Sequence, residues 1–181
     1  MGWFSPVKGS YPSLAQVDKT LPVKDGVTNI KRGMIVALKA DGDGKSKEGV
    51  WDVATGAADE ILYVALQDYS DPTAGFAGTA FDPKGGVPRI TALDLAQDGE
   101  FETSVFDTTK TYAVGDKLYA SGGVLTNTGN KVVGYVTLPP TERWINNAIA
   151  VPKQGPGVDT DPRLAIRTGA NQNVIRFKTA V

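Results

Sequence analysis

The chain contains 181 residues, a length that fits one domain, with or without long arms. Hydrophobic residues make up 41% and charged residues 22%, so a packed core can form and disorder throughout is excluded. The net charge is −1 and both histidine and cysteine are absent, which excludes polyanion binding by the whole chain, Ser-His-Asp and Cys-His catalysis, Cys/His zinc sites and disulfides.

Residues that form turns are frequent along the whole chain. The 21 glycines and 11 prolines lie between short runs of Val, Ile, Leu, Tyr and Thr. This spacing is typical of many short strands joined by turns and disfavours long helices. The sequence therefore predicts a mainly β fold, with a small antiparallel β-barrel or β-sandwich as its core.

Three parts differ in pattern. Residues 1–28 contain several prolines and no lasting period, and are expected to form an extended N-terminal arm. Residues 29–138 are the expected barrel or sandwich core, interrupted by a long glycine-rich loop at 68–88; loops of this length are usually functional or mobile. Residues 139–181 begin with two consecutive prolines and are expected to be a C-terminal extension.

Short alternating runs predict the strands of the core. In the first of them, residues 34–39, both faces are apolar, so this strand is expected to be covered on both sides. The later strands are expected at residues 51–54, 61–67, 89–96, 101–106, 116–119, 124–126 and 132–138. Beyond them, residues 144–149 fit a short helix, although a strand at 148–151 fits equally, and two short strands are expected at 164–167 and 174–177.

Two stretches of the core resemble each other. In each, a glycine, Gly33 or Gly115, precedes a strand, and two further short strands follow after turns. Either the chain contains a duplicated unit, or these are two generic three-stranded meanders. The second interpretation is favoured, because short antiparallel meanders resemble one another by chance.

No residues form a recognisable catalytic, cofactor-binding or metal-binding motif. Residues 41–46 resemble the start of a calcium loop, but Lys45 stands where an oxygen ligand is required, so a hairpin turn is the better interpretation. Glycine-rich phosphate loops and nucleophile elbows are absent from the sequence. We therefore expect no enzyme activity and no cofactor.

Charge is distributed unevenly. Residues 1–32 and 141–181 each carry a net charge of +3, while the part between them carries −7. Basic ends on an acidic body can dock on a neighbouring acidic body, or can fold back on their own domain. The basic residues are too sparse to indicate nucleic acid, and no apolar run is long enough to predict a membrane span or an export signal.

One run in the core carries a family resemblance. Residues 112–126 read YAVGDKLYASGGVLT and are followed by VVGYV at 132–136; with residues 30–39 and 63–68, this pattern resembles the capsid decoration proteins of tailed bacteriophages, also called structural cement proteins. The resemblance covers about a quarter of the chain. It implies a small β-barrel or sandwich, without catalytic residues, on the outer surface of the phage head in the virion, made in the cytoplasm of a bacterial host.

The resemblance also implies partners. Such a protein would bridge capsomers by binding the major capsid protein and other copies of itself, with a trimer favoured over a dimer, and would bind neither nucleic acid nor membrane. Its expected contacts come from aromatic anchors in the arms and the long loop, since aromatic residues are enriched in interfaces. The candidate interface residues are Trp3, Phe4, Tyr11, Phe76, Phe81 and Trp144.

Two alternatives remain open. The first is a β-module of a phage tail or baseplate, which would assemble with tail proteins. The second is a carbohydrate-binding β-domain, which would need exposed aromatic side chains on a concave face. In contrast, Trp51 and Tyr63 are expected in the core, because they lie on strands with strong apolar alternation.

Overall fold

The structure is a computed structural model that describes residues 4–8, 18–42, 44, 46–70, 80–81, 88–96, 98–149 and 167–180. All regular elements in these ranges are β-strands, which confirms the predicted mainly β class. They are β1 (Phe4–Lys8), β2 (Asp18–Pro22), β3 (Asn29–Ile30), β4 (Ile35–Lys39), β5 (Val50–Val53), β6 (Ile61–Ala65), β7 (Tyr69–Ser70), β8 (Ala80–Phe81), β9 (Pro88–Asp94), β10 (Glu100–Thr103), β11 (Lys117–Ser121), β12 (Val124–Thr126), β13 (Val132–Ile149) and β14 (Arg167–Thr179).

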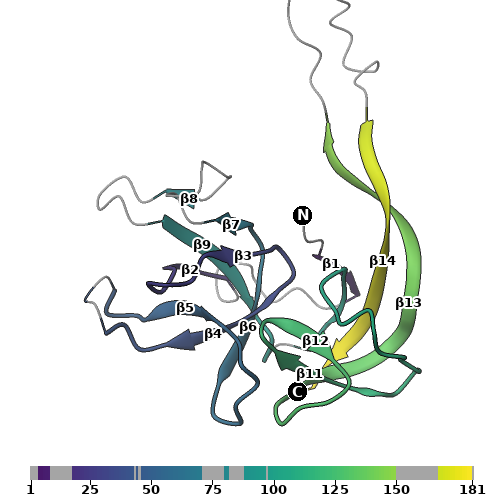
Figure 1. Cartoon of the computed structure of the whole chain (residues 1–181), viewed down its shortest axis with the longest axis horizontal. Coiled ribbons are helices and arrows are strands. Elements are labelled where there is room, and N and C mark those ends of the chain that lie inside the picture. The colour runs from purple at the N-terminus through teal and green to yellow at the C-terminus, as the bar shows by residue number, and fades with distance from the viewer. Residues whose placement is uncertain are drawn as a thin grey trace, which may run out of the picture.

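The strands form two larger antiparallel sheets that lie side by side (Figure 1). One sheet has the order β2-β9-β6-β4-β5, with β8 paired to β9, and a small β3–β7 pair accompanies it. The other has the order β1-β10-β14-β13-β11-β12. We call β2, β4, β5, β6 and β9 the first unit, and β10 to β14 the second unit.

The two units have the same topology. Numbered along the chain within each unit, the strands lie side by side in the order first, fifth, fourth, second, third. All five strands of one unit correspond to those of the other. The internal resemblance in the sequence covered only the second, third and fourth strands of each unit. The structure therefore favours the repeated-unit interpretation over that of two generic meanders.

The turn before the second strand is also the same in both units. Gly33 and Gly115 adopt φ values of 89° and 90°, which glycine reaches without steric cost. Each donates its backbone N–H to a carbonyl of the fourth strand, Gly33 to Ala65 and Gly115 to Val136, both at 2.8 Å. The bonds in the other direction match too. The N–H of Ala65 donates to the Met34 carbonyl and the N–H of Val136 donates to the Asp116 carbonyl, both at 2.9 Å.

Each sheet curls until distant strands meet at a single parallel bridge. In the first unit Val23, just after β2, bridges Trp51 of β5; in the second unit Phe106, after β10, bridges Leu125 of β12. A single bridge is not a ladder, so neither sheet is a fully closed barrel. The fold is a pair of strongly curled sheets, close to the predicted sandwich.

The core explains the apolar pattern of the central strands. Val36, Trp51 and Tyr63 lie in a cluster inside the first unit. Alternate residues of β4 and β6 point the other way and pack against the second unit, where they join a cluster that includes Phe101, Phe106, Leu118, Leu125, Ile175 and Phe177. The first unit supplies Ile35, Ala37, Leu62 and Val64 to that shared cluster. The expectation that residues 34–39 are covered on both sides is therefore confirmed.

The predicted boundaries at 28 and 138 do not coincide with the observed elements. Residues 18–22, expected in the arm, form β2, and Leu21 and Val23 are buried. The boundary at 138 falls inside β13, which continues to Ile149. The C-terminal part returns as β14 at the centre of the second sheet, where Ile175 and Phe177 are fully buried. Apolar alternation at 174–177 thus marked a core strand and not an extension.

Candidate interaction surface

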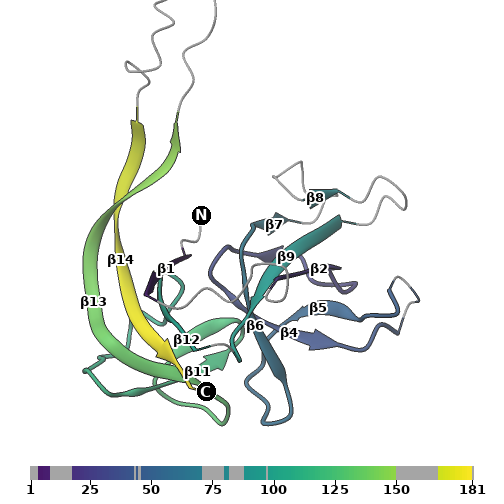
Figure 2. The ribbon, with the colours of Figure 1, turned by 180° about the vertical axis from the view of Figure 1, so that it is seen from behind.

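The most prominent feature of the molecule is a long two-stranded ribbon made by β13 and β14. Both strands leave the second unit together and project from the body (Figures 1 and 2). Their pairing runs from Gly134–Thr179 at the base to Ile149–Arg167. Within the described residues, β11 pairs with β13 only up to Tyr135, and β10 pairs with β14 only from Ile175 onward. Farther out, each strand has only the other as its described partner.

Bulges in one strand explain the curvature of the ribbon. The register shifts between Val136 and Leu138, between Leu138 and Thr141, and between Asn146 and Ala148, and each shift adds one residue to β13. A bulge bends its strand and increases the local twist. Because all three lie on β13, this strand is the longer one, and near the base it runs along the outer side of the bend (Figure 1).

Two prolines occupy the second of these bulges. Pro139 and Pro140 lie where the ribbon leaves the core. Proline has no N–H, so within sheets it is confined to edges, strand starts and bulges. The expected end of this strand at residue 138, just before the prolines, is wrong, because the bulge accommodates them and the antiparallel pairing resumes at Thr141.

A buried ion cluster fixes the base of the ribbon. Glu102 of β10 is 4% exposed and lies on the face opposite the apolar core. Its Oε1 accepts hydrogen bonds from Nε and Nη2 of Arg176 at 2.9 and 2.7 Å, and lies 3.0 Å from Nη2 of Arg143. Three strands, β10, β14 and β13, therefore meet at one carboxylate. Removing that carboxylate would leave two guanidinium groups close together.

The first unit also has a long connection. In each unit the longest link joins the fourth strand to the fifth: the ribbon in the second unit, and residues 66–87, with β7 and β8, in the first. β7 and β8 lie toward the end of the molecule from which the ribbon projects (Figures 1 and 2).

The candidate interface residues lie on different elements. Phe4 is on β1, paired with Thr103, and Trp144 is on β13, paired with Asn171; both belong to the second sheet. Phe81 is on β8, paired with Pro88 beside the first unit. Trp3, Tyr11 and Phe76 lie outside the described residues. The backbone thus places Phe4 and Trp144 in one sheet and separates Phe81 from them.

Glu60 is a second buried carboxylate, in the loop between β5 and β6. Its side chain is fully buried and accepts hydrogen bonds from the backbone N–H of Gly56 and Thr55 and from the Thr55 hydroxyl, with Lys39 Nζ 3.0 Å away. Burial by itself raises the pKa of Glu60, but Lys39 and these hydrogen bonds outweigh it, and the pKa is lowered. All of its partners are structural, so this group stabilises a loop.

A shallow polar depression lies where the second unit curls on itself. Asp107, Lys110, Ser121 and Thr126 line it, among others. The Asp107 carboxylate accepts hydrogen bonds from the hydroxyl and N–H of Thr109, which lower its pKa. Beside it, burial raises the pKa of Tyr112 to about 12, and the Tyr112 hydroxyl donates to the Asp107 carbonyl. These groups bond to one another within a turn and present no pair arranged for acid–base chemistry.

The described residues contain neither a candidate metal cluster nor a candidate membrane-spanning helix. Within the described ranges, no three acidic side chains gather closely enough to hold a metal ion. The same ranges contain no helix long and apolar enough to cross a bilayer.

Aromatic side chains in the described residues are mostly internal. Trp51 is fully buried, its indole N–H donates to the Ile90 carbonyl at 3.0 Å, and its ring contacts Tyr63. The prediction that Trp51 and Tyr63 are core residues is confirmed. Of the described large apolar side chains, Ile61, Val114 and Tyr135 are exposed, and Tyr135 is the one aromatic among them. This set does not form the concave aromatic face that sugar binding would need.

The ribbon itself was missed by sequence reasoning. Residues 144–149, for which a short helix or a strand was left open, lie in β13. The β-branched and aromatic residues Thr141, Trp144, Ile145 and Ile149 were an available signal for a strand. Comparisons of the chain with protein families, with curated proteins and with solved structures found no match.

Proposed function

We propose that this protein is a capsid decoration protein, which binds the outer surface of a phage head and stabilises the lattice by bridging neighbouring capsomers. Its partners are the major capsid protein and other copies of itself, and it has no enzyme activity. The observation that carries the proposal is the β13–β14 ribbon, together with the sequence resemblance at residues 112–126 and 132–136.

The ribbon supports a binding role for an energetic reason. An isolated two-stranded hairpin is at best marginally stable in water, because it lacks a layer to pack against. The outer part of this ribbon, beyond Thr141, has no described strand beside it. A projecting element of this kind is stabilised when a partner covers it.

The arrangement of the two units also supports the proposal. β7 and β8, on the long link of the first unit, lie toward the end of the molecule from which the ribbon projects, so one surface of a shell could contact both (Figure 1). Two linked contacts bind more tightly than either alone when the geometry permits both. The buried Glu102 cluster holds the ribbon base, so less ordering is required on binding.

Co-sedimentation with undecorated phage heads tests the proposal. The full-length protein is expected to pellet with heads at a saturating stoichiometry. A shortened variant should not, in which Asn-Gly replaces residues 144–171 so that Arg143 and Gln172, which are partners in the ribbon, are joined by a two-residue turn. Control variants Ile61→Ser and Val114→Ser change exposed apolar residues outside the ribbon and should still pellet.

The opposite results are equally informative. A folded full-length protein that stays in the supernatant would contradict the decoration role and favour assembly with tail or baseplate proteins. Undiminished pelleting of the shortened variant would show that the ribbon is not the contact.

A further inference from the structure

The two outer edges of the ribbon are backbone surfaces whose hydrogen bonds have no described partner strand. On β13 this edge extends from Thr141 to Ile149, and on β14 from Arg167 to Val174. An uncovered strand edge is a template for pairing with another chain, and proteins usually block such edges. Here prolines block only the base of β13, at residues 139 and 140.

The two edges are matched in position. Thr141 pairs with Val174 and Ile149 pairs with Arg167, so both edges cover the same stretch of the ribbon. At about 3.4 Å per residue, each is roughly 25–30 Å long. Two copies standing side by side at the same height could therefore pair along the whole of this stretch.

Strand direction and shape select which edges meet. β13 and β14 are antiparallel, so if two ribbons point the same way, β14 of one copy lies antiparallel to β13 of the next. Within this stretch β13 has nine residues and β14 has eight, because the bulge between Asn146 and Ala148 lies on β13. The two edges thus have nearly the same length, which fits β14 of one copy beside β13 of the next.

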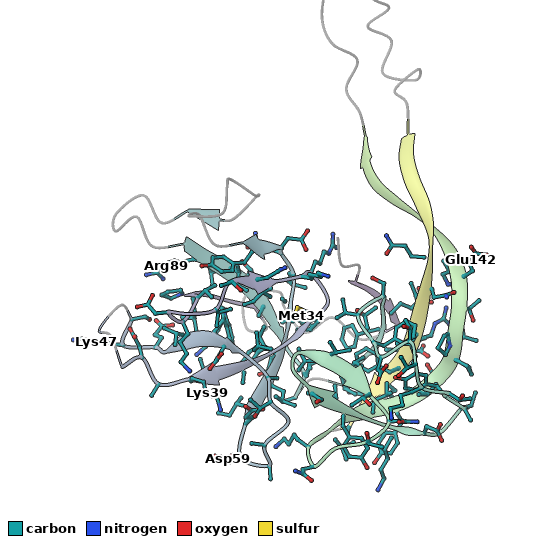
Figure 3. All side chains as sticks on the ribbon, in the orientation of Figure 1. Met34, Lys39, Lys47, Asp59, Arg89 and Glu142 are labelled. Atoms are coloured by element: carbon teal, nitrogen blue, oxygen red, sulfur yellow. The ribbon has the colours of Figure 1, made fainter. Side chains whose placement is uncertain are left out.

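We propose that ribbons of neighbouring copies of this chain join edge to edge, with β14 of one copy paired to β13 of the next. The contact is heterologous, and closure of the copies into a ring leaves every edge paired. Three copies would give a closed sheet of six antiparallel strands. Glu142, near the start of the β13 edge, is exposed on the side of β13 that faces away from the body (Figure 3).

The proposal does not depend on head binding and is tested with the purified full-length protein. Light scattering should give a multiple of 19.1 kDa, three-fold if the ring contains three copies. The shortened variant, with Asn-Gly in place of residues 144–171, should be a monomer. The proposal would be overturned if the full-length protein stayed monomeric at about 100 times the lowest concentration that light scattering detects. A shortened variant that still forms the multimer would overturn it as well.

Hydrogen exchange on the full-length protein separates edge pairing from side-chain association and needs no variant. In a free ribbon, alternate amides of 141–149 and 167–174 point to solvent and exchange quickly. In the ring they are hydrogen-bonded, and their exchange should be about 100-fold slower or more. A multimer whose alternate edge amides still exchange as fast as in an open strand would refute the pairing, whether or not the protein binds heads.

Discussion

The first and second units share one strand order but use it differently. In the first unit, β4 and β6 are apolar on both faces, because one face fills the unit and the other packs against the second unit. In the second unit, the fourth and fifth strands continue outward as the ribbon. The comparison shows that the link between the fourth and fifth strands can be lengthened without disturbing the shared core, because it leaves the sheet at its rim.

The largest expected effect tests whether the two units fold together. Trp51 and Leu125 occupy equivalent bridge positions and are both fully buried. Trp51→Ala should lower the free energy of unfolding by about 3–5 kcal/mol, and Leu125→Ala by about 2–5 kcal/mol. Because the units share one apolar cluster, both variants should shift a single cooperative urea transition followed by circular dichroism. Two separate transitions in either variant would show that the units unfold independently.

The next prediction concerns the contact between the units. Gly56 has a φ of 86°, and a Cβ there would lie 2.1 Å from the Ala120 carbonyl oxygen of the second unit. Gly56→Ala should therefore cost about 3 kcal/mol or more, because backbone must move as well as adopt a strained φ. The control Gly115→Ala has a φ of 90° but open space around its Cβ, so it should cost about 1 kcal/mol. Equal losses in thermal or urea denaturation would mean that the contact between the units contributes little.

The next prediction concerns the ion cluster at the ribbon base, in the second unit. Glu102→Gln removes the carboxylate shared by Arg143 and Arg176 and should cost about 1–3 kcal/mol, since both arginines are partly exposed and can be rehydrated. The matched control Asp98→Asn removes the exposed ion pair between Asp98 and Lys178, which lies on β14 like Arg176. This variant should cost less than about 0.5 kcal/mol. If urea denaturation gives the two variants the same stability, the buried cluster does not hold the ribbon.

The last prediction is a pH dependence in the first unit. The pKa of Glu60 is lowered from its ordinary value of 4.5, so its ionised form stabilises the folded state above that pH. This contribution is lost as the pH falls from about 5 through the pKa of the folded protein. At neutral pH, Glu60→Gln should be less stable than the natural protein by about 1–3 kcal/mol. Urea midpoints of the two proteins should converge on acidification, and a constant difference down to pH 3 would contradict the assignment.

Local patterns were sufficient to predict much of the fold. Alternation and turn residues predicted the β class and strands close to β4, β5, β6, β9, β10, β12 and the first part of β13. The apolar residues on both faces at 34–39 correctly indicated cover on both sides. Trp51 and Tyr63 were predicted as core residues for the same reason. Alternate residues of a strand point to opposite faces, so a buried face appears in the sequence as a short-range apolar period.

Other features depend on contacts between distant residues. The proline pair at 139 and 140 is a strand breaker by local rules, yet a bulge opposite β14 keeps the antiparallel pairing. β14 belongs to the core because it lies between β10 and β13, residues remote in sequence. The shared five-strand order and the Glu102 cluster likewise join residues that are tens of positions apart. Strand pairing and charge contacts between distant residues leave no periodic pattern in the local sequence, so only the tertiary structure determines them.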